Sequence, residues 1–131
     1  MILGVINIFI VNSLKQMIII RRVYDQTEIG EQYKVFIDRL WPRGISKEKA
    51  GWDEWMKEIS PSNELRKWFN HDPDNWELFS QLYRKELTQK PHELIKLKQL
   101  ERKFGTLTLL YAAKDEKQNN ACVLKEFLLT M

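Results

Sequence analysis

The chain has 131 residues, of which 44% are hydrophobic and 30% charged, and a formal net charge of +3. These values are typical of one globular domain with a single core and exclude a disordered or low-complexity chain. The basic residues alternate with acids, which fits a small anionic ligand and disfavours a nucleic-acid partner. A single cysteine, Cys122, excludes an internal disulfide framework and is typical of a reducing cytoplasm.

Residues 1–16 are strongly apolar but do not have the features of a secretion signal. They lack a basic start and a small-residue cleavage site. The apolar run also breaks at Asn12, well short of the ~20 residues that a membrane span needs. Met17 is a second possible start, so we expect residues 1–16 to be an N-terminal extension. An extra strand or helix is the alternative. Residues 17–131 are predicted to form one cytoplasmic domain with no membrane contact.

Three apolar runs predict strands at residues 18–24, 33–37 and 106–112. The polar loop between the first two is about eight residues long, and a parallel crossover needs roughly a dozen. These two strands are therefore either antiparallel neighbours or not neighbours at all, and a mixed sheet is expected. The third run is almost continuously apolar, which predicts a strand buried on both faces.

Helical spacing and capping residues predict several helices between and after these strands. The stretch after Ser46 places apolar side chains from Trp52 to Ile59 on one face. Further helices are expected to begin at Pro61, Pro73 and Pro91, and a last one after Asn119 or Asn120. The order predicts an α/β fold with a small mixed, mainly parallel sheet covered by helices in a single domain.

The seven residues from Asp38 to Gly44 directly follow the second predicted strand. Ligands of open α/β sheets bind at the carboxyl ends of the strands. Arg39 and Arg43 carry forked donors that suit phosphate or carboxylate, and Lys47 follows them in the next turn. This turn is therefore predicted to be one half of an anion-binding cleft.

The turn after the third strand is the predicted other half of this cleft. If the two strands are parallel, both turns lie at the same edge of the sheet. The start of the last helix offers N–H groups to an anion, and an aromatic side chain is available at each strand end to stack on a base. The predicted ligand-binding residues are Arg39, Trp41, Arg43, Lys47, Tyr111, Lys114 and Asn119.

Other interpretations of these residues stay open. Asp38 can pair with Arg39, Arg43 or Lys114 and simply hold the loop, and Trp41 can belong to the core. Alternatively, the protein is a hydrolase or transferase at the same cleft. A carboxylate within reach of a substrate proton acts as general base. The candidate catalytic residues are Asp38, Asp115 and His71.

A third possibility is an interaction or nucleic-acid-binding protein, with basic residues at 21–22 and 96–103. The chain has no glycine-rich phosphate loop and no dinucleotide fingerprint. Its two histidines and one cysteine are far apart in the sequence, so no metal site and no cofactor are expected.

The string from Asp38 to Gly44 also carries a family resemblance. Together with Arg22 to Asp25, Leu65 to Phe69 and Leu109 to Asp115, it resembles the YeaO-like branch of domain-of-unknown-function family 488. The resemblance runs from about residue 18 to residue 128 and implies a small cytoplasmic α/β protein with no assigned activity. The wider family often has Cys-His-Arg before the last helix, and the YeaO-like branch usually has Asn-His-Ala. This chain has Asn119, Asn120 and Ala121, so chemistry by a thiol or imidazole at this turn is not expected.

Overall fold

The computed structural model of the protein describes residues 17–26 and 33–131. Four strands form one sheet in the order β1-β4-β2-β3, and every pairing is parallel. The strands are β1 (Met17–Arg22), β2 (Tyr33–Phe36), β3 (Glu54–Trp55) and β4 (Thr106–Tyr111). The α/β class is confirmed, but the described strands include no antiparallel pair. The predicted extension, residues 1–16, lies outside the described residues.

The position of β4 explains the short connection between β1 and β2. β4 lies between them and pairs with both, so the two strands are not neighbours, which is one of the two arrangements that the loop length allows. Because all pairings are parallel, β1, β2 and β4 end at the same edge of the sheet. The two turns predicted to form a cleft therefore do lie at one edge.

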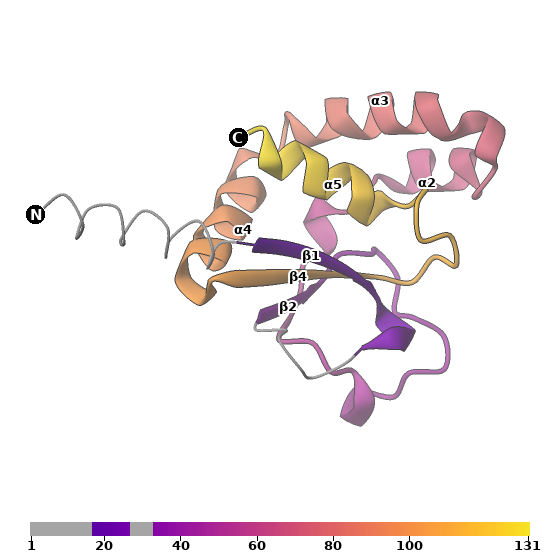
Figure 1. The fold of residues 1–131 in the computed structure, drawn as a ribbon. Coiled ribbons are helices and arrows are strands. Elements are labelled where there is room, and N and C mark those ends of the chain that lie inside the picture. Colours follow the sequence, from indigo (N-terminus) through magenta and orange to yellow (C-terminus); the bar gives the residue numbers. More distant parts are fainter. Residues whose placement is uncertain (1–16, 27–32) are drawn as a thin grey trace, which may run out of the picture.

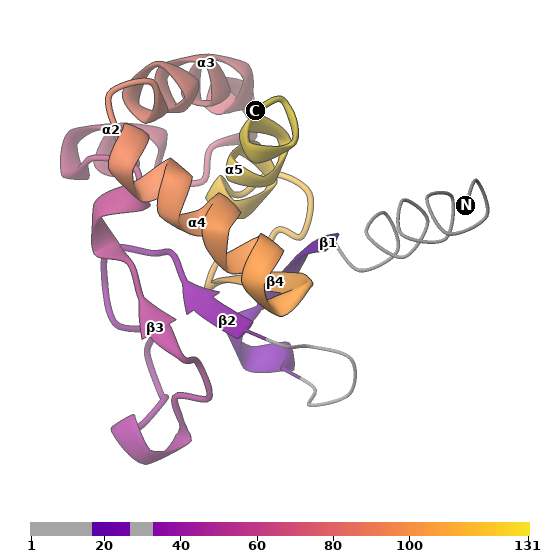
Figure 2. The ribbon, with the colours of Figure 1, turned by 90° about the vertical axis from the view of Figure 1, so that its left-hand side faces the viewer.

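Four helices cover one face of the sheet (Figures 1 and 2). They are α2 (Asn63–Phe69), α3 (Trp76–Leu87), α4 (Pro91–Phe104) and α5 (Asn120–Leu129). Alternate strand residues such as Val35, Leu107 and Leu109 point to this face and pack in the main core. Gly105 ends α4 with a φ of 80°, as its sequence position predicts.

The opposite face of the sheet is covered by the long connection between β2 and α2. Phe36 and Leu110 point to this side and form a second, smaller core cluster. The Trp52 ring stacks on Phe36 at a centroid distance of 4.8 Å. Trp41 meets Trp52 and Trp55 edge-on at 4.9 Å and 5.5 Å. These aromatic side chains fix the loop that begins at Asp38 against the sheet.

The helix predicted after Ser46 does not form. The region instead contains two short 3-10 turns, η2 (Lys47–Lys49) and η3 (Lys57–Ile59), with strand β3 between them. The backbone of Asp53 and Met56 donates to Lys34 and Phe36 of β2, which draws this stretch into the sheet. The helical spacing of its apolar residues was misleading because packing on Phe36 outweighs local propensity.

The remaining predicted helix starts agree with the structure to within three residues. Ser62 caps α2, so Pro61 lies just before the helix rather than at its first position. Asp72 caps a 3-10 turn, η4 (Pro73–Asn75), which leads into α3. Near the start of the described residues, a further 3-10 turn, η1 (Val23–Asp25), follows β1. None of the helices in the described ranges has the length and apolar character needed to cross a membrane.

Candidate functional site

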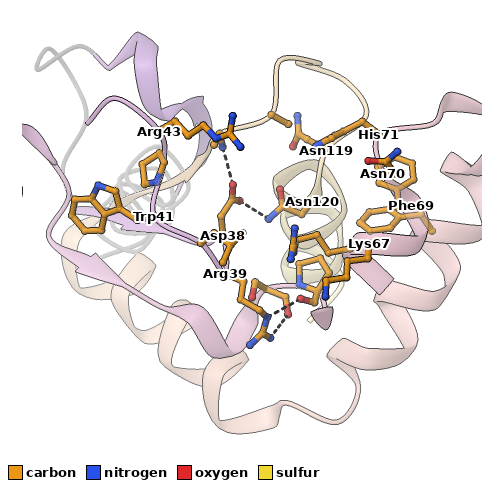
Figure 3. Close-up of a pocket in the computed structure, with 18 of the residues that line it drawn as sticks. Asp38, Arg39, Trp41, Arg43, Lys67, Phe69, Asn70, His71, Asn119 and Asn120 are labelled. Atoms are coloured by element: carbon orange, nitrogen blue, oxygen red, sulfur yellow. Dashed lines mark hydrogen bonds between the residues drawn. The ribbon is translucent and has the colours of Figure 1, made fainter. Parts of the chain in front are cut away.

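A cleft of about 540 Å³ lies at the edge of the sheet where β2 and β4 end. Figure 3 shows Asp38 and Asn120 at its centre, with Trp41 and Arg43 to one side and Phe69, Asn70 and His71 to the other. Its walls therefore come from the loop after β2, the end of α2, and the start of α5. The further lining residues include Tyr24, Leu40, Pro42, Arg66, Lys67, Phe79, Ala112 and Ala113.

Asp38 connects the three elements that meet at this edge. Its Oδ2 accepts a hydrogen bond from the backbone N–H of Ala112 at 3.1 Å, and its Oδ1 accepts one from Nδ2 of Asn120 at 2.9 Å. Its backbone carbonyl accepts a third from Nε1 of Trp55 at 2.7 Å. The carboxylate thus joins the residue after β2 to the residue after β4 and to the first turn of α5.

Burial raises the pKa of the Asp38 carboxyl above its ordinary value. The two hydrogen bonds from Asn120 and Ala112 oppose this rise, and the charges of His71 and Arg66 oppose it further. The positive groups therefore lie close enough to act on Asp38. No ion pair to Asp38 is found among the described residues.

The cleft is rich in positive charge. Arg39, Arg43, Arg66 and Lys67 line it together with His71. Among the described residues that line the cleft, Asp38 is the only acidic one. None of the three ion pairs within residues 17–26 and 33–131 involves any of these side chains. In Arg66, Nη2 donates to Asn63 at 3.4 Å, but the buried Nε has no hydrogen-bond partner in the described structure. A buried donor without a partner is rare and costly.

Arg39 holds the chain that leads into α2. Its guanidinium donates to the carbonyls of Pro61 and Ser60 at 3.2 Å and 3.5 Å, away from Asp38 (Figure 3). On the same segment, the carboxylate of Glu86 accepts from both the backbone and the hydroxyl of Ser62, at 2.8 Å and 2.6 Å. Arg39 therefore positions the helix that carries Arg66 and Lys67, and two of its N–H donors are already engaged.

The backbone at the end of α2 has an unusual conformation. Asn70 and His71 both have positive φ values, 46° and 56°. A positive φ is uncommon for any residue other than glycine, although Asn and His adopt it more often than most. The His71 ring packs near Phe69 at a centroid distance of 6.0 Å, at the rim of the cleft. Strained backbone of this kind is found more often at functional sites than elsewhere.

The two predicted aromatic residues have different positions. Trp41 lines the cleft, but its Nε1 donates to the carbonyl of Ile45 at 2.6 Å and its ring lies within the tryptophan cluster. Tyr111 is only 3% exposed and packs in the main core, where burial raises the pKa of its hydroxyl. Tyr111 is not a lining residue, so the structure does not bring it to the site.

Three other predicted residues also lie outside the cleft. Lys47 and Lys114 are exposed and do not line it. Asp115 is exposed as well, and its Oδ1 accepts from the backbone N–H of Lys117 and Gln118 at 2.9 Å and 3.0 Å. These bonds lower the pKa of Asp115. Asp115 therefore shapes the turn before α5 and is not part of the cleft surface.

Asn119 lines the cleft, and both its side-chain oxygen and its side-chain nitrogen already make a hydrogen bond within the protein. Its Oδ1 accepts from the backbone N–H of Cys122 at 3.0 Å, and its Nδ2 donates to the carbonyl of Asp115 at 2.9 Å. The residue is 2% exposed and caps α5, as predicted for Asn119 or Asn120. It fixes the start of the helix that carries Asn120.

Several cleft residues were not among those predicted from the sequence. Arg66, Lys67 and Asn70 come from α2 and the turn after it, which do not directly follow a strand predicted from the sequence and so carried no strand-end signal. Asn120 was considered as a possible helix cap and for its departure from the family pattern, but not as a ligand-binding residue. The sequence signal for it was its place next to the helix cap, one residue into α5.

Comparisons with known proteins relate this chain to proteins of unassigned function. Residues 17–131 match a family model, DUF488-N3i, described as "Inactive DUF488-N3 subclade". The "Uncharacterized protein YeaO" of Escherichia coli K12 is 44% identical over 111 residues, which is 85% of this chain and 96% of the relative. The "Uncharacterized protein Rv3073c" of Mycobacterium tuberculosis and "Mb3100c" of Mycobacterium bovis are 32% identical over 83% of this chain and 91% of theirs. No solved structure matches.

Proposed function

The chain belongs to the DUF488-N3i subclade of domain-of-unknown-function family 488, and from this premise we propose that it binds a small organic anion in the cleft around Asp38. The family resemblance seen in the string from Asp38 to Gly44 is confirmed by these comparisons. The proposed ligand is phosphorylated or nucleotide-like, or carries a carboxylate. Arg43, Arg66 and Lys67 are the proposed anion-binding residues.

One observation carries this proposal. Arg43, Arg66 and Lys67 line one cleft and make no ion pair within the described structure, and a buried donor of Arg66 has no partner. Positive side chains that line a concave surface raise the local concentration of anions. Guanidinium groups bind phosphate and carboxylate through paired N–H donors.

The same geometry favours binding over catalysis. A reaction that uses both Asp38 and Asp115 requires the two carboxylates at one substrate, but Asp115 is not a lining residue. The Asp38 carboxylate accepts two hydrogen bonds that hold Ala112 and Asn120 in place. The family model that matches the chain describes its subclade as inactive, which agrees with a binding role. For the compartment we propose the cytoplasm, because the chain has a single cysteine.

The proposal is tested by thermal-shift screening of the full chain against phosphorylated and carboxylated metabolites, followed by isothermal titration of the ligands that stabilise it. We expect Arg43→Ala and Arg66→Ala to weaken binding by about tenfold or more each, since a hydrogen bond to a charged group contributes about 1.5–3 kcal/mol. Arg102→Ala is the matched control, because Arg102 is exposed on α4 and does not line the cleft.

Two results would contradict the proposal. One is the absence of any stabilising ligand in a broad panel. The other is a ligand whose affinity falls equally in Arg43→Ala, Arg66→Ala and Arg102→Ala. In that case the anion interacts with the overall positive charge and not with this cleft.

A further inference from the structure

The hydrogen-bonding groups of the cleft are divided by polarity. At its centre, Nδ2 of Asn120 donates to Asp38 at 2.9 Å and to the carbonyl of Ile37 at 3.4 Å, so both of its N–H groups are used. The amide oxygen of Asn120 has no donor among the described residues. The N–H of Ala112 is used by Asp38 at 3.1 Å. The side-chain groups that the centre still offers to a ligand are therefore the Asp38 carboxylate and the Asn120 carbonyl, and both are acceptors.

The surrounding side chains offer the opposite polarity. Arg43, Arg66 and Lys67 are permanently charged donors with no acceptor atoms in their side chains. Arg66 lies close enough to Asp38 for its charge to act on that carboxyl. The acceptors and the donors are thus parts of one cavity, and a single ligand can contact both.

The size and the walls of the cleft define the ligand further. A volume of about 540 Å³ is within the range of pockets that bind small organic molecules, and it is much larger than a bare phosphate or sulfate ion needs. Apolar side chains form part of the walls: Leu40, Pro42, Phe69 and Phe79. These surfaces fit a carbon framework between the two polar ends.

We propose that the ligand is bipolar, with an amine or other N–H donor bound to Asp38 and Asn120 and an anionic group bound to Arg43, Arg66 and Lys67. This inference rests on the proposed anion-binding function and narrows its ligand class. A phosphorylated or carboxylated amine and a nucleotide with an exocyclic amine share this chemistry. An anion without an N–H donor gives the Asp38 carboxylate no hydrogen bond beyond those from Ala112 and Asn120. It also places a second negative group in the same partly buried site, which is unfavourable.

Matched ligand pairs test the inference on the unaltered protein. O-phosphoethanolamine is compared with ethyl phosphate, and AMP with purine riboside 5′-monophosphate; in each pair the second member lacks only the amine. Isothermal titration is expected to show that the amine member of one pair binds roughly tenfold more tightly or better. The pair that shows the preference identifies the source of the amine, an alkyl amine or a nucleobase.

Two further measurements locate the amine. The carboxyl ¹³C resonance of Asp38 should shift on addition of the amine member and not with its partner. In Asp38→Asn, checked for folding by thermal denaturation, the preference should fall to about twofold or less while the anion still binds. If Asp38→Asn does not fold, the shift of the Asp38 carboxyl resonance in the wild-type protein tests the contact with the amine by itself.

The possible outcomes distinguish a failure of the bipolar-ligand inference from a failure of the proposed anion-binding function. If both members of each pair bind equally well, or the Asp38 resonance does not respond, the bipolar ligand is wrong and the anion-binding function stands. If anions bind from the wider panel but neither amine member does, the inference is also overturned. If no anion binds at all, the proposed function fails together with it.

Discussion

The side-chain amide of Asn120 lies 2.9 Å from the carboxylate of Asp38, so the first turn of α5 is joined directly to the residue that follows β2. These residues are 82 positions apart in the chain. The other oxygen of the same carboxylate accepts from the backbone of Ala112, which follows β4. The arrangement gives Asp38 a structural role, because it holds the base of the cleft together while part of its surface faces the cavity.

Replacement of Asp38 by alanine is expected to lower the free energy of unfolding. It leaves the N–H of Ala112 and one N–H of Asn120 without acceptors in a partly buried place, and an unsatisfied donor costs about 1–3 kcal/mol. Urea denaturation followed by tryptophan fluorescence measures the change. Asp74→Ala is the control, because the Asp74 side chain is exposed and accepts no hydrogen bond in the described structure. Equal stability of the two variants would contradict the structural role of Asp38.

The stabilising effect of Asp38 is expected to depend on pH in a defined direction. Burial raises the pKa of its carboxyl above the ordinary 3.8, so the native protein keeps this proton to a higher pH than the unfolded chain does. The contribution of the Asp38 carboxyl to the free energy of unfolding is therefore fully present below its ordinary pKa. This contribution decreases as the pH rises through the pKa of the native protein. The difference in unfolding free energy between wild type and Asp38→Ala should shrink accordingly.

Urea denaturation of both proteins from roughly pH 3 to pH 8 measures this difference. A ¹³C titration of the Asp38 carboxyl provides an independent value, with an expected midpoint above 3.8. A midpoint below that value would show that the hydrogen bonds from Asn120 and Ala112 outweigh burial. A difference that grows with pH would lead to the same conclusion.

The fold class and the position of the cleft could be predicted from the sequence because they depend on local patterns. The strands at residues 17–22, 33–36 and 106–111 are apolar runs of β-forming residues, and Asp72 and Asn119 are capping residues at helix starts. Parallel strands bring their carboxyl ends together, which is why the turn at Asp38 and the turn before α5 were expected to meet. The loop length between β1 and β2 also correctly allowed a strand between them.

What could not be predicted depends on tertiary packing. The region from residue 46 to residue 59 has helical spacing, yet its aromatic residues pack on Phe36 and its backbone pairs with β2. The same limit applies to single side chains. Sequence position does not reveal that Arg39 donates to Pro61, that Tyr111 is buried, or that Lys114 lies outside the cleft. Arg66 and Lys67 line the cleft from a helix that follows no strand predicted from the sequence.

Arg39 and Arg43 are predicted to have different roles, although both belong to the same turn. Arg39→Ala removes the donor to the buried carbonyl of Pro61, so we expect a loss of about 1–2 kcal/mol of stability. Arg43 has an exposed side chain, and only its backbone carbonyl is bonded, to the hydroxyl of Tyr24 at 2.8 Å. Arg43→Ala should therefore change stability by less than about 0.5 kcal/mol. Chemical denaturation of the two variants measures both values.

Arg39→Lys helps to interpret this comparison. Lysine keeps the charge but cannot reproduce the two donors that reach Ser60 and Pro61, so only part of the stability should return. Full recovery would mean that charge alone matters at this position. If Arg43→Ala proved as destabilising as Arg39→Ala, the assignment of Arg43 to ligand binding would lose its basis.

Asn119 is expected to stabilise α5 through its side-chain oxygen, which accepts from the backbone N–H of Cys122 at 3.0 Å. Loss of such a cap costs about 0.5–2 kcal/mol, and Asn119→Ala also removes the bond to the carbonyl of Asp115. Asn119→Asp keeps an acceptor at the helix start, where a negative charge is favourable, so it should cost less than alanine. Ser46→Ala serves as the control, because Ser46 precedes η2 without any side-chain cap. Thermal and urea denaturation of the three variants should show that Asn119→Ala is the least stable. If Asn119→Asp were no more stable than Asn119→Ala, the amide donor to Asp115, and not the helix cap, would be what holds this turn.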